Sequence, residues 1–184
     1  MKLRGSTHLF SGLAAASLLS TNLPGLGMAA LGALLPDIDQ PGSMISREVA
    51  GVPFGRIGRG IVGIAILGAW HQTRLPLLLP VGIAFVALAF LHHRGITHSL
   101  SGLMLAWLAI KTLSWPQVPF LIGYGIHLAE DLLTPSGIPL LYPWQERMRI
   151  PLAQTGGLID RTLGLAALAL FLIAVGKGLL VTLR

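Results

Sequence analysis

One apolar segment near residue 130 carries a histidine and an aspartate at a spacing that suits metal binding. In "GIHLAEDLL", His127 and Asp131 are four residues apart. On a helix this spacing puts both side chains on one face, one turn apart, where they can bind one divalent cation. A buried His–Asp hydrogen bond without a metal is the alternative. Glu130 points about 100° away from Asp131 and is expected to be solvated or to support the ligands.

A pair of acids follows an earlier apolar segment. Asp37 and Asp39 come directly after Pro36, so the chain there is expected to be extended or to turn. Two acids two residues apart on an extended chain project to the same side, where they could each bind a metal or bridge two. A helix-ending turn, in which Asp is favoured, is the alternative, and it explains one acid better than two.

The stretch "HHRGITHSL", residues 92–100, places three histidines and an arginine between two strongly apolar segments. His92 and His93 are neighbours and cannot both face one centre from a helix. We therefore expect His98 to be a metal ligand, with His93 and Arg94 lining the site. His92 is expected to lie at the membrane interface.

Hydroxyl residues stand beside two candidate ligands. Thr97 and Ser99 flank His98 and are expected to hydrogen-bond it or to cap the helix that follows. His8 opens the first apolar run and follows a Ser-Thr pair that is expected to cap it. Beside the other clusters, His8 becomes a sixth candidate ligand.

Together these clusters offer more ligands than one zinc ion requires, since a catalytic zinc takes three protein ligands and a water. Six ligands suit a two-metal site of the kind that activates water in phosphoester hydrolysis. We therefore expect one or two divalent ions, zinc or manganese. Arg94 would then bind the substrate anion and His93 would transfer protons. The candidate metal ligands are His8, Asp37, Asp39, His98, His127 and Asp131.

The composition indicates a membrane protein. The 184 residues are 53% hydrophobic and only 11% charged, whereas a soluble domain has about a quarter of its residues charged. The net charge of +6 is spread through loops and forms no stripe, so it suits anionic headgroups and gives no support to nucleic-acid binding. The sequence has no cysteine, which excludes disulfides and thiolate ligands.

Turn signals divide the apolar sequence into short helices. "STNLPG", "WHQTRLP" and "SWPQVP" interrupt it at three points. We therefore expect an all-α membrane protein of three short helical hairpins in a bundle, residues 1–162, followed by a transmembrane helix over 163–184. The arms are short for a bilayer, which takes about 20 residues. His71, at a hairpin tip beside Trp70, is expected to be an interface residue only.

Hairpins of this kind bring both of their ends to one side, so every ionisable cluster is expected at one face. Basic residues are more numerous at this face than at the hairpin tips, which predicts that it is cytoplasmic. The basic and apolar start, "MKLRGSTHLFSGLAAASLL", is expected to be a retained helix, with a cleaved signal peptide as the alternative.

The ordered motifs resemble those of the inner-membrane-associated metal-dependent hydrolases, a family also labelled LexA-binding. The resemblance rests on "THLFSG", "ALLPDIDQPGS", "HRGITHSL" and "GYGIHLAEDLLTPSGIPLLYPW". It implies an inner-membrane hydrolase and a regulatory protein as a further partner. That family is distantly similar to the zinc-dependent phospholipase C and P1-nuclease group, which is all-helical with a multi-zinc site.

Three functions follow from these patterns. The leading one is a metal-dependent hydrolase of phosphoester bonds in a lipid or lipid-linked substrate, acting through metal-activated water. A metal- or ion-binding transport protein is the second, because ionisable residues inside membranes also mark ion pathways. A regulatory membrane scaffold, in which the polar cluster only holds the hairpins together, is the third.

Overall fold

Helices make up the described structure, as the sequence predicts. A computed structural model describes residues 4–40, 43–44, 56–76, 78–90, 95–111 and 115–182. Within these residues no strand forms, and the all-helical class is confirmed. The α-helices are α1 (Gly5–Ser17), α2 (Leu23–Leu34), α4 (Arg56–Thr73), α5 (Leu78–Phe90), α6 (Leu100–Lys111), α7 (Gln117–Leu132) and α8 (Leu158–Thr182), with short 3₁₀ helices η1 (Leu35–Asp39) and η2 (Ile96–His98). Two compact units result, Met1–Pro36 with Arg94–Arg184 and Asp37–His93.

The first turn signal works as its chemistry predicts. The side chain of Asn22 accepts a hydrogen bond from the Gly25 N–H at 2.7 Å and so caps α2, whose first turn contains Pro24. The chain thereby reverses between α1 and α2. The ends of this hairpin, at His8 and Ala33, both reach α7.

Helices α2 and α7 touch backbone to backbone because glycines line their contact. A Cβ atom on Gly32 would collide with the carbonyl oxygen of Phe120, and one on Gly123 would collide with that of Ala29. Small residues permit such close approach where lipid supplies no hydrophobic driving force between helices. The two helices run in the same direction, since Gly25 lies near Pro119 and Ala33 near His127.

Ser99 begins α6 as its cap. Its Oγ accepts from the Gly102 N–H at 3.1 Å and donates to the Ile96 carbonyl oxygen at 2.6 Å. The expected capping by Ser99 is therefore confirmed. Beside it, the Tyr124 hydroxyl of α7 donates to the Thr97 carbonyl oxygen. These bonds fix η2 against α7, and η2 carries His98.

The segment between α7 and α8 closes the C-terminal end of α7. The N–H groups of Ile150, Leu152 and Ala153 donate to the carbonyl oxygens of Leu132 and Leu133. The last carbonyls of a helix have no partner within the helix, so an end that is shielded from water needs partners from another segment. The loop of residues 145–157 thus holds the helix turn that carries Asp131.

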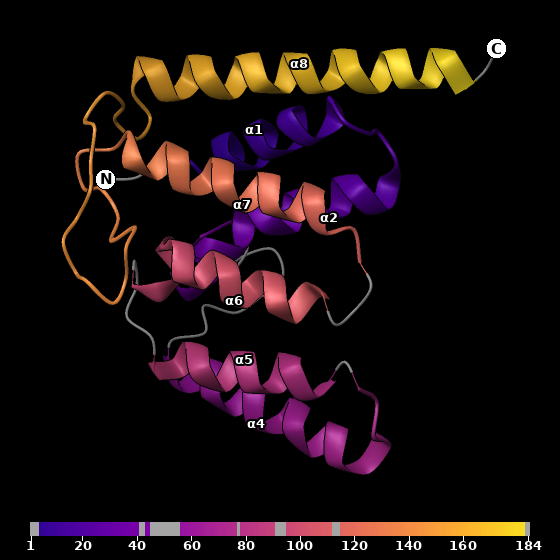
Figure 1. The fold of residues 1–184 in the computed structure, drawn as a ribbon, viewed down its shortest axis with the longest axis vertical. Coiled ribbons are helices and arrows are strands. Elements are labelled where there is room, and N and C mark those ends of the chain that lie inside the picture. Colours follow the sequence, from indigo (N-terminus) through magenta and orange to yellow (C-terminus); the bar gives the residue numbers. More distant parts are fainter. Residues whose placement is uncertain are drawn as a thin grey trace. The chain divides into compact units, whose positions relative to one another are not determined.

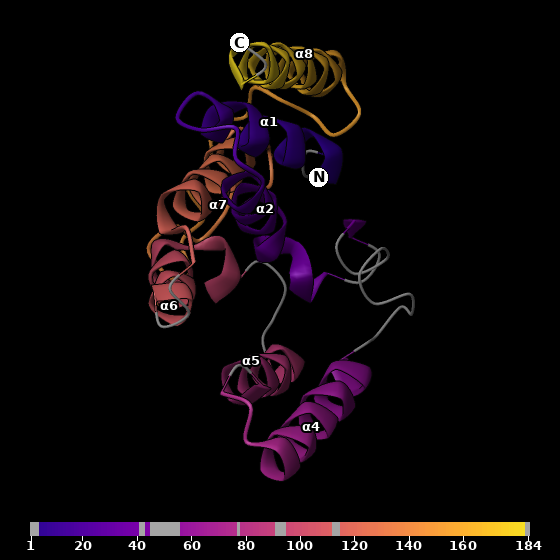
Figure 2. The ribbon, with the colours of Figure 1, turned by 90° about the vertical axis from the view of Figure 1, so that its right-hand side faces the viewer.

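Helix α8 lies along α1 and runs in the same direction (Figures 1 and 2). Gly164 of α8 faces Thr7 near the start of α1, and Gly178 faces Thr21 just after its end. Among the described residues, Leu158–Leu180 is the one stretch both long and apolar enough to cross a membrane, and only 6% of the span's apolar window is buried. The helix begins at Leu158, earlier than the predicted start at residue 163.

In the second unit, α4 and α5 form a close pair. Gly63 approaches Val86, and Gly82 approaches Leu67. Arg59 on α4 is buried and donates to the Ile38 carbonyl oxygen at 3.2 Å. One of the basic residues counted toward a cytoplasmic face is therefore bound inside this unit, which weakens the charge count that predicted the orientation.

We expect Gly123→Ala to destabilise the protein and Gly125→Ala not to. A methyl group at residue 123 meets the Ala29 carbonyl oxygen, whereas one at residue 125 of the same helix meets nothing within 4 Å. Separating the helices should cost roughly 1–3 kcal/mol, while Ala in place of Gly125 should stabilise by up to about 1 kcal/mol. Thermal unfolding in detergent measures both, and equal melting temperatures would contradict the close contact.

Candidate metal site

Four potential ligands meet inside the first unit, on three separate elements. His8 comes from α1, His98 from η2, and His127 and Asp131 from α7, and all four are 0% exposed. Ligand atoms of His8, His127 and Asp131 lie within 4.8 Å of one another. The predicted spacing of His127 and Asp131 on one helix face is therefore found.

Asp131 stands at the centre of the group. Its Oδ2 lies 3.4 Å from His98 Nε2 and 3.9 Å from His127 Nε2. Its Oδ1 lies 3.7 Å from His8 Nε2. His98 Nε2 and His127 Nε2 are 3.4 Å apart. All three imidazole rings thus turn the same nitrogen toward one carboxylate.

The other nitrogen of each ring has a partner of its own. Nδ1 of His8 is 2.6 Å from Glu130 Oε2, and Nδ1 of His127 is 2.7 Å from the Ala33 carbonyl oxygen. Nδ1 of His98 is 3.1 Å from Thr97 Oγ1. Metal-binding histidines characteristically make such outer hydrogen bonds, which fix the ring orientation and the tautomer.

These partners determine where two of the protons lie. A carbonyl oxygen can only accept, so Nδ1 of His127 carries the proton, and Nδ1 of His8 does the same when it donates to the Glu130 carboxylate. In the neutral rings the lone pair is then on Nε2, the atom that faces Asp131. The Nε2 lone pairs of His8 and His127 therefore lie beside the Asp131 carboxylate, where a cation could be held.

The separations between neighbouring donor atoms can be compared with those of a tetrahedral zinc site. Zinc–nitrogen and zinc–oxygen bonds of about 2.0–2.1 Å imply donor atoms about 3.3 Å apart on a tetrahedron. The separations of 3.4, 3.4, 3.7 and 3.9 Å are slightly wider, and they involve both carboxylate oxygens of Asp131. His8, His127 and Asp131 form a set whose ligand atoms all lie within 4.8 Å of one another, and His98 contacts that set through His127 and Asp131.

Charge balance also favours a cation. Asp131 is fully buried and Glu130 is 5% exposed, and both contact the same histidine. Two buried carboxylates are costly unless positive charge is held beside them. One divalent ion would supply that charge with the histidines neutral. The rings of His8 and His127 stack with centroids 3.9 Å apart, which disfavours protonating both.

The other predicted site residues belong to the second unit or lie outside the described residues. Asp37 is buried and follows α2 on η1, but it belongs to the second unit, which is described by itself. The side chain of Asp39 and the whole of His93 and Arg94 lie outside the described residues. Their predicted roles remain predictions. His71 is exposed on α4, consistent with an interface residue.

The structure decides between the two expectations for Glu130. It is buried against His8 and supports that ring, so solvation is wrong. Helix α1 covers the adjacent face of α7, on which Glu130 lies, and the sequence did not reveal this. Thr134 donates to the Asp131 backbone carbonyl oxygen at 2.8 Å, which supports the end of α7.

Sequence reasoning missed Asp160. This residue of α8 is fully buried, and its carboxylate accepts from the Thr7 hydroxyl and the Gly156 N–H, both at 2.6 Å. The predicted cap at the start of α1 is therefore wrong. The helix begins at Gly5 without a side-chain cap, and Thr7 reaches α8 instead. The sequence did contain one signal for this contact, because Asp160 is an isolated acid in the first turn of an apolar helix.

The membrane character that the composition indicates agrees with the comparisons. The family model described as "YdjM inner membrane protein" matches residues 1–183. The chain belongs to this family. Inner membrane protein YdjM of Escherichia coli is 31% identical over 149 residues, or 75% of this chain and 60% of that protein, with the same values for Shigella flexneri. YvsG of Bacillus subtilis, described as uncharacterized, is 32% identical over 119 residues, or 60% of this chain and 71% of that protein.

Membership of the YdjM family supports an inner-membrane location. The chain spans about 60% of the length of the YdjM proteins it matches. No solved structure matches the chain. The family's description names neither hydrolysis nor the phospholipase C and P1-nuclease group, so these expectations stay untested.

We expect Asp160→Ala to lower the free energy of unfolding by roughly 1–3 kcal/mol, because it leaves buried donors without their acceptor. Glu146→Ala removes an exposed carboxylate from the same region and should change stability by less than about 0.5 kcal/mol. Thermal unfolding of both variants in detergent measures the difference. Equal melting temperatures would show that Asp160 does not hold α8 to α1.

Proposed function

We propose that this protein is a membrane-bound, metal-dependent hydrolase of phosphoester bonds in a lipid or lipid-linked substrate. The observation that best supports a bound metal is the orientation of three histidines. Each holds Nδ1 on another partner and turns Nε2 toward Asp131. The membrane family supports a substrate that is itself at the bilayer.

In this proposal the helices form short hairpins embedded in the bilayer, with the site near the cytoplasmic face. The short apolar stretches Leu23–Ile38 and Leu100–Lys111 support partial embedding beside the longer α8. The N-terminal helix is retained, because His8 on α1 is part of the site. A regulatory protein partner remains a further part of the proposal.

The roles of the chain's own residues follow from their contacts. Asp131, His8, His98 and His127 would hold the cation, and Asp37 and Asp39 complete the proposed ligand set. A divalent zinc or manganese ion bound there would supply a Lewis acid that activates water and polarises a phosphoryl oxygen. Glu130 fixes the His8 ring.

Two residues of the "HHRGITHSL" stretch complete the proposed chemistry. Arg94 would bind the phosphoryl anion, and His93 would move the proton. The burial of the cluster would keep bulk water away from the reacting group, which strengthens each electrostatic contact there.

A second function is favoured by one observation, the complete burial of all four ligands. Closed sites with four protein ligands are typical of structural zinc. In that case the metal would hold α1, η2 and α7 together, and the protein would be a membrane scaffold. Both functions predict a bound metal, but only the hydrolase predicts catalytic turnover.

Metal content is the first test. We expect detergent-purified protein to carry one or two divalent transition metals per chain, and His127→Ala and Asp131→Ala to lose them. Mass spectrometry of the intact protein and elemental analysis measure this. His71→Ala, which removes an exposed histidine of α4, is the matched control and should retain the metal. Well-folded protein that takes up neither zinc nor manganese would overturn the site.

Glu130→Gln belongs in the same experiment. It removes charge from a residue that contacts a ligand rather than the metal, so affinity should fall about 10–100-fold without being lost. Complete loss would place Glu130 among the ligands.

Hydrolysis is the second test. We expect metal-loaded protein in lipid vesicles to release phosphate or a phosphorylated headgroup from a phosphoester lipid, and Asp131→Ala to lose this activity while keeping its helical content. Glu146→Ala, an exposed carboxylate change, should leave turnover unchanged. Unchanged turnover in Asp131→Ala would refute the assignment, and metal binding without turnover of phosphoester lipids would favour the scaffold.

A further inference from the structure

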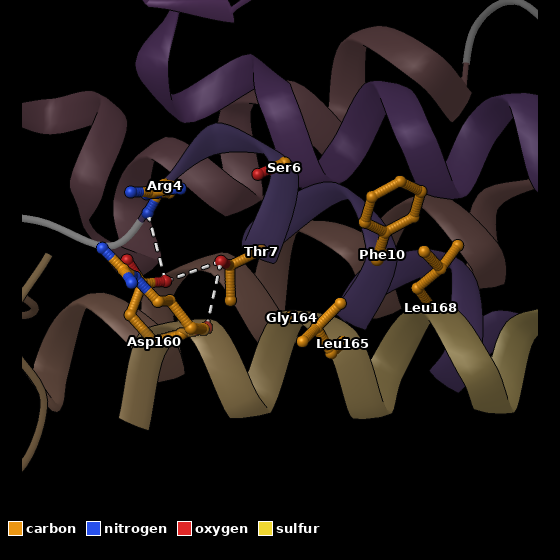
Figure 3. A pocket seen from close by; sticks show the side chains of 9 residues that line it. Arg4, Ser6, Thr7, Phe10, Asp160, Gly164, Leu165 and Leu168 are labelled. Atoms are coloured by element: carbon orange, nitrogen blue, oxygen red, sulfur yellow. Dashed lines mark hydrogen bonds between the residues drawn. The ribbon is translucent and has the colours of Figure 1, made fainter. Parts of the chain in front are cut away.

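A cleft of about 260 Å³ opens between the first turns of α1 and α8 (Figure 3). Its polar end includes Arg4, Thr7 and Arg161. Further along the two helices it is lined by Phe10, Leu165 and Leu168. The cleft therefore has a basic end and an apolar end. None of the four buried candidate ligands lines it.

The acid at the basic end is already satisfied without either arginine side chain. Asp160 accepts from the Thr7 hydroxyl, the Gly156 N–H and the Arg4 backbone N–H, the last at 3.4 Å. Among the described residues, the guanidinium groups of Arg4 and Arg161 form no hydrogen bond or ion pair, and both residues are exposed. Two positive charges thus remain available to a ligand in the cleft.

The position of the cleft relates it to the bilayer. Helices α1 and α8 run in the same direction, and on each the arginine precedes the apolar lining residues. Leu165 is 68% exposed, as expected for a helix surrounded by lipid. With α8 across the membrane, the arginines lie at headgroup level and the apolar end points toward the bilayer interior.

A neighbouring groove between the same two helices provides a comparison. It has a volume of about 300 Å³ and is lined by Ser11, alanines and leucines, with no charged residue. An acyl chain could lie in either groove. Only the first combines that surface with two arginines, so only the first can distinguish lipids by their headgroup charge.

We propose that the cleft between α1 and α8 binds one anionic glycerophospholipid. Its phosphate lies between the guanidinium groups of Arg4 and Arg161, and one acyl chain follows Phe10, Leu165 and Leu168. Basic pockets between membrane helices bind anionic headgroups by this combination of charge and apolar surface. The proposal is independent of metal binding and of hydrolysis, because it concerns the other face of α1.

Native mass spectrometry of the full chain in detergent tests this proposal. The probes are phosphatidylglycerol and phosphatidylcholine with the same acyl chains. We expect the wild-type protein to retain one phosphatidylglycerol in preference to phosphatidylcholine. Arg161→Gln should weaken that binding about fivefold and Arg4→Gln with Arg161→Gln about 25-fold, with phosphatidylcholine binding unchanged.

Arg147→Gln with Arg149→Gln is the matched control, since it removes the same charge from two exposed arginines outside the cleft. An equal loss in this control would show unspecific attraction to the basic surface and overturn the site. Leu168→Asp should also abolish binding. Soluble glycerol phosphate should compete more weakly than the lipid, and equal competition would contradict a site for an acyl chain. If Arg4→Gln disturbs folding, Arg161→Gln alone decides, and unchanged lipid preference in that variant overturns the proposal.

Discussion

The contact between α2 and α7 controls the geometry of the polar cluster. Gly32 and Gly123 bring the two backbones together, and this places the Ala33 carbonyl oxygen 2.7 Å from His127 Nδ1. That oxygen can only accept, so it fixes both the ring and the proton of His127. The close packing of two glycines, which have no polar side-chain atoms, thereby determines which nitrogen of His127 faces Asp131.

Helix α1 supports the cluster from the other side and makes different contacts on its two faces. His8 faces α7, where Glu130 holds its ring, while the preceding Thr7 faces α8 and bonds Asp160. Gly12 approaches both Ala33 and Gly123. The first helix is thus fixed by polar contacts at its beginning and by close packing in its middle, which limits how far His8 can move.

Much of the site was accessible from the sequence because it depends on local geometry. The i, i+4 spacing of His127 and Asp131 and the hydroxyl residues beside His98 predict their arrangement directly, and turn signals predict the helices. The supporting role of Glu130 and the bond from Thr7 to Asp160 depend on which helix covers which face. Hydrophobic periodicity is weak in helices that are apolar all round, so it could not reveal those pairings.

The order of synthesis has a consequence for when the cluster forms. Thr7 and Asp160 are 153 positions apart, and His8 and Glu130 are 122 apart. Contacts between such distant positions form late, and domains fold as the chain emerges from its N-terminal end. His8 can therefore meet Glu130 and Asp131 only after the chain has been synthesised through α7. Assembly of the polar cluster would then favour the correct insertion of α7. If α7 were inserted wrongly, the ionisable side chains of the cluster would face hydrocarbon, which is costly.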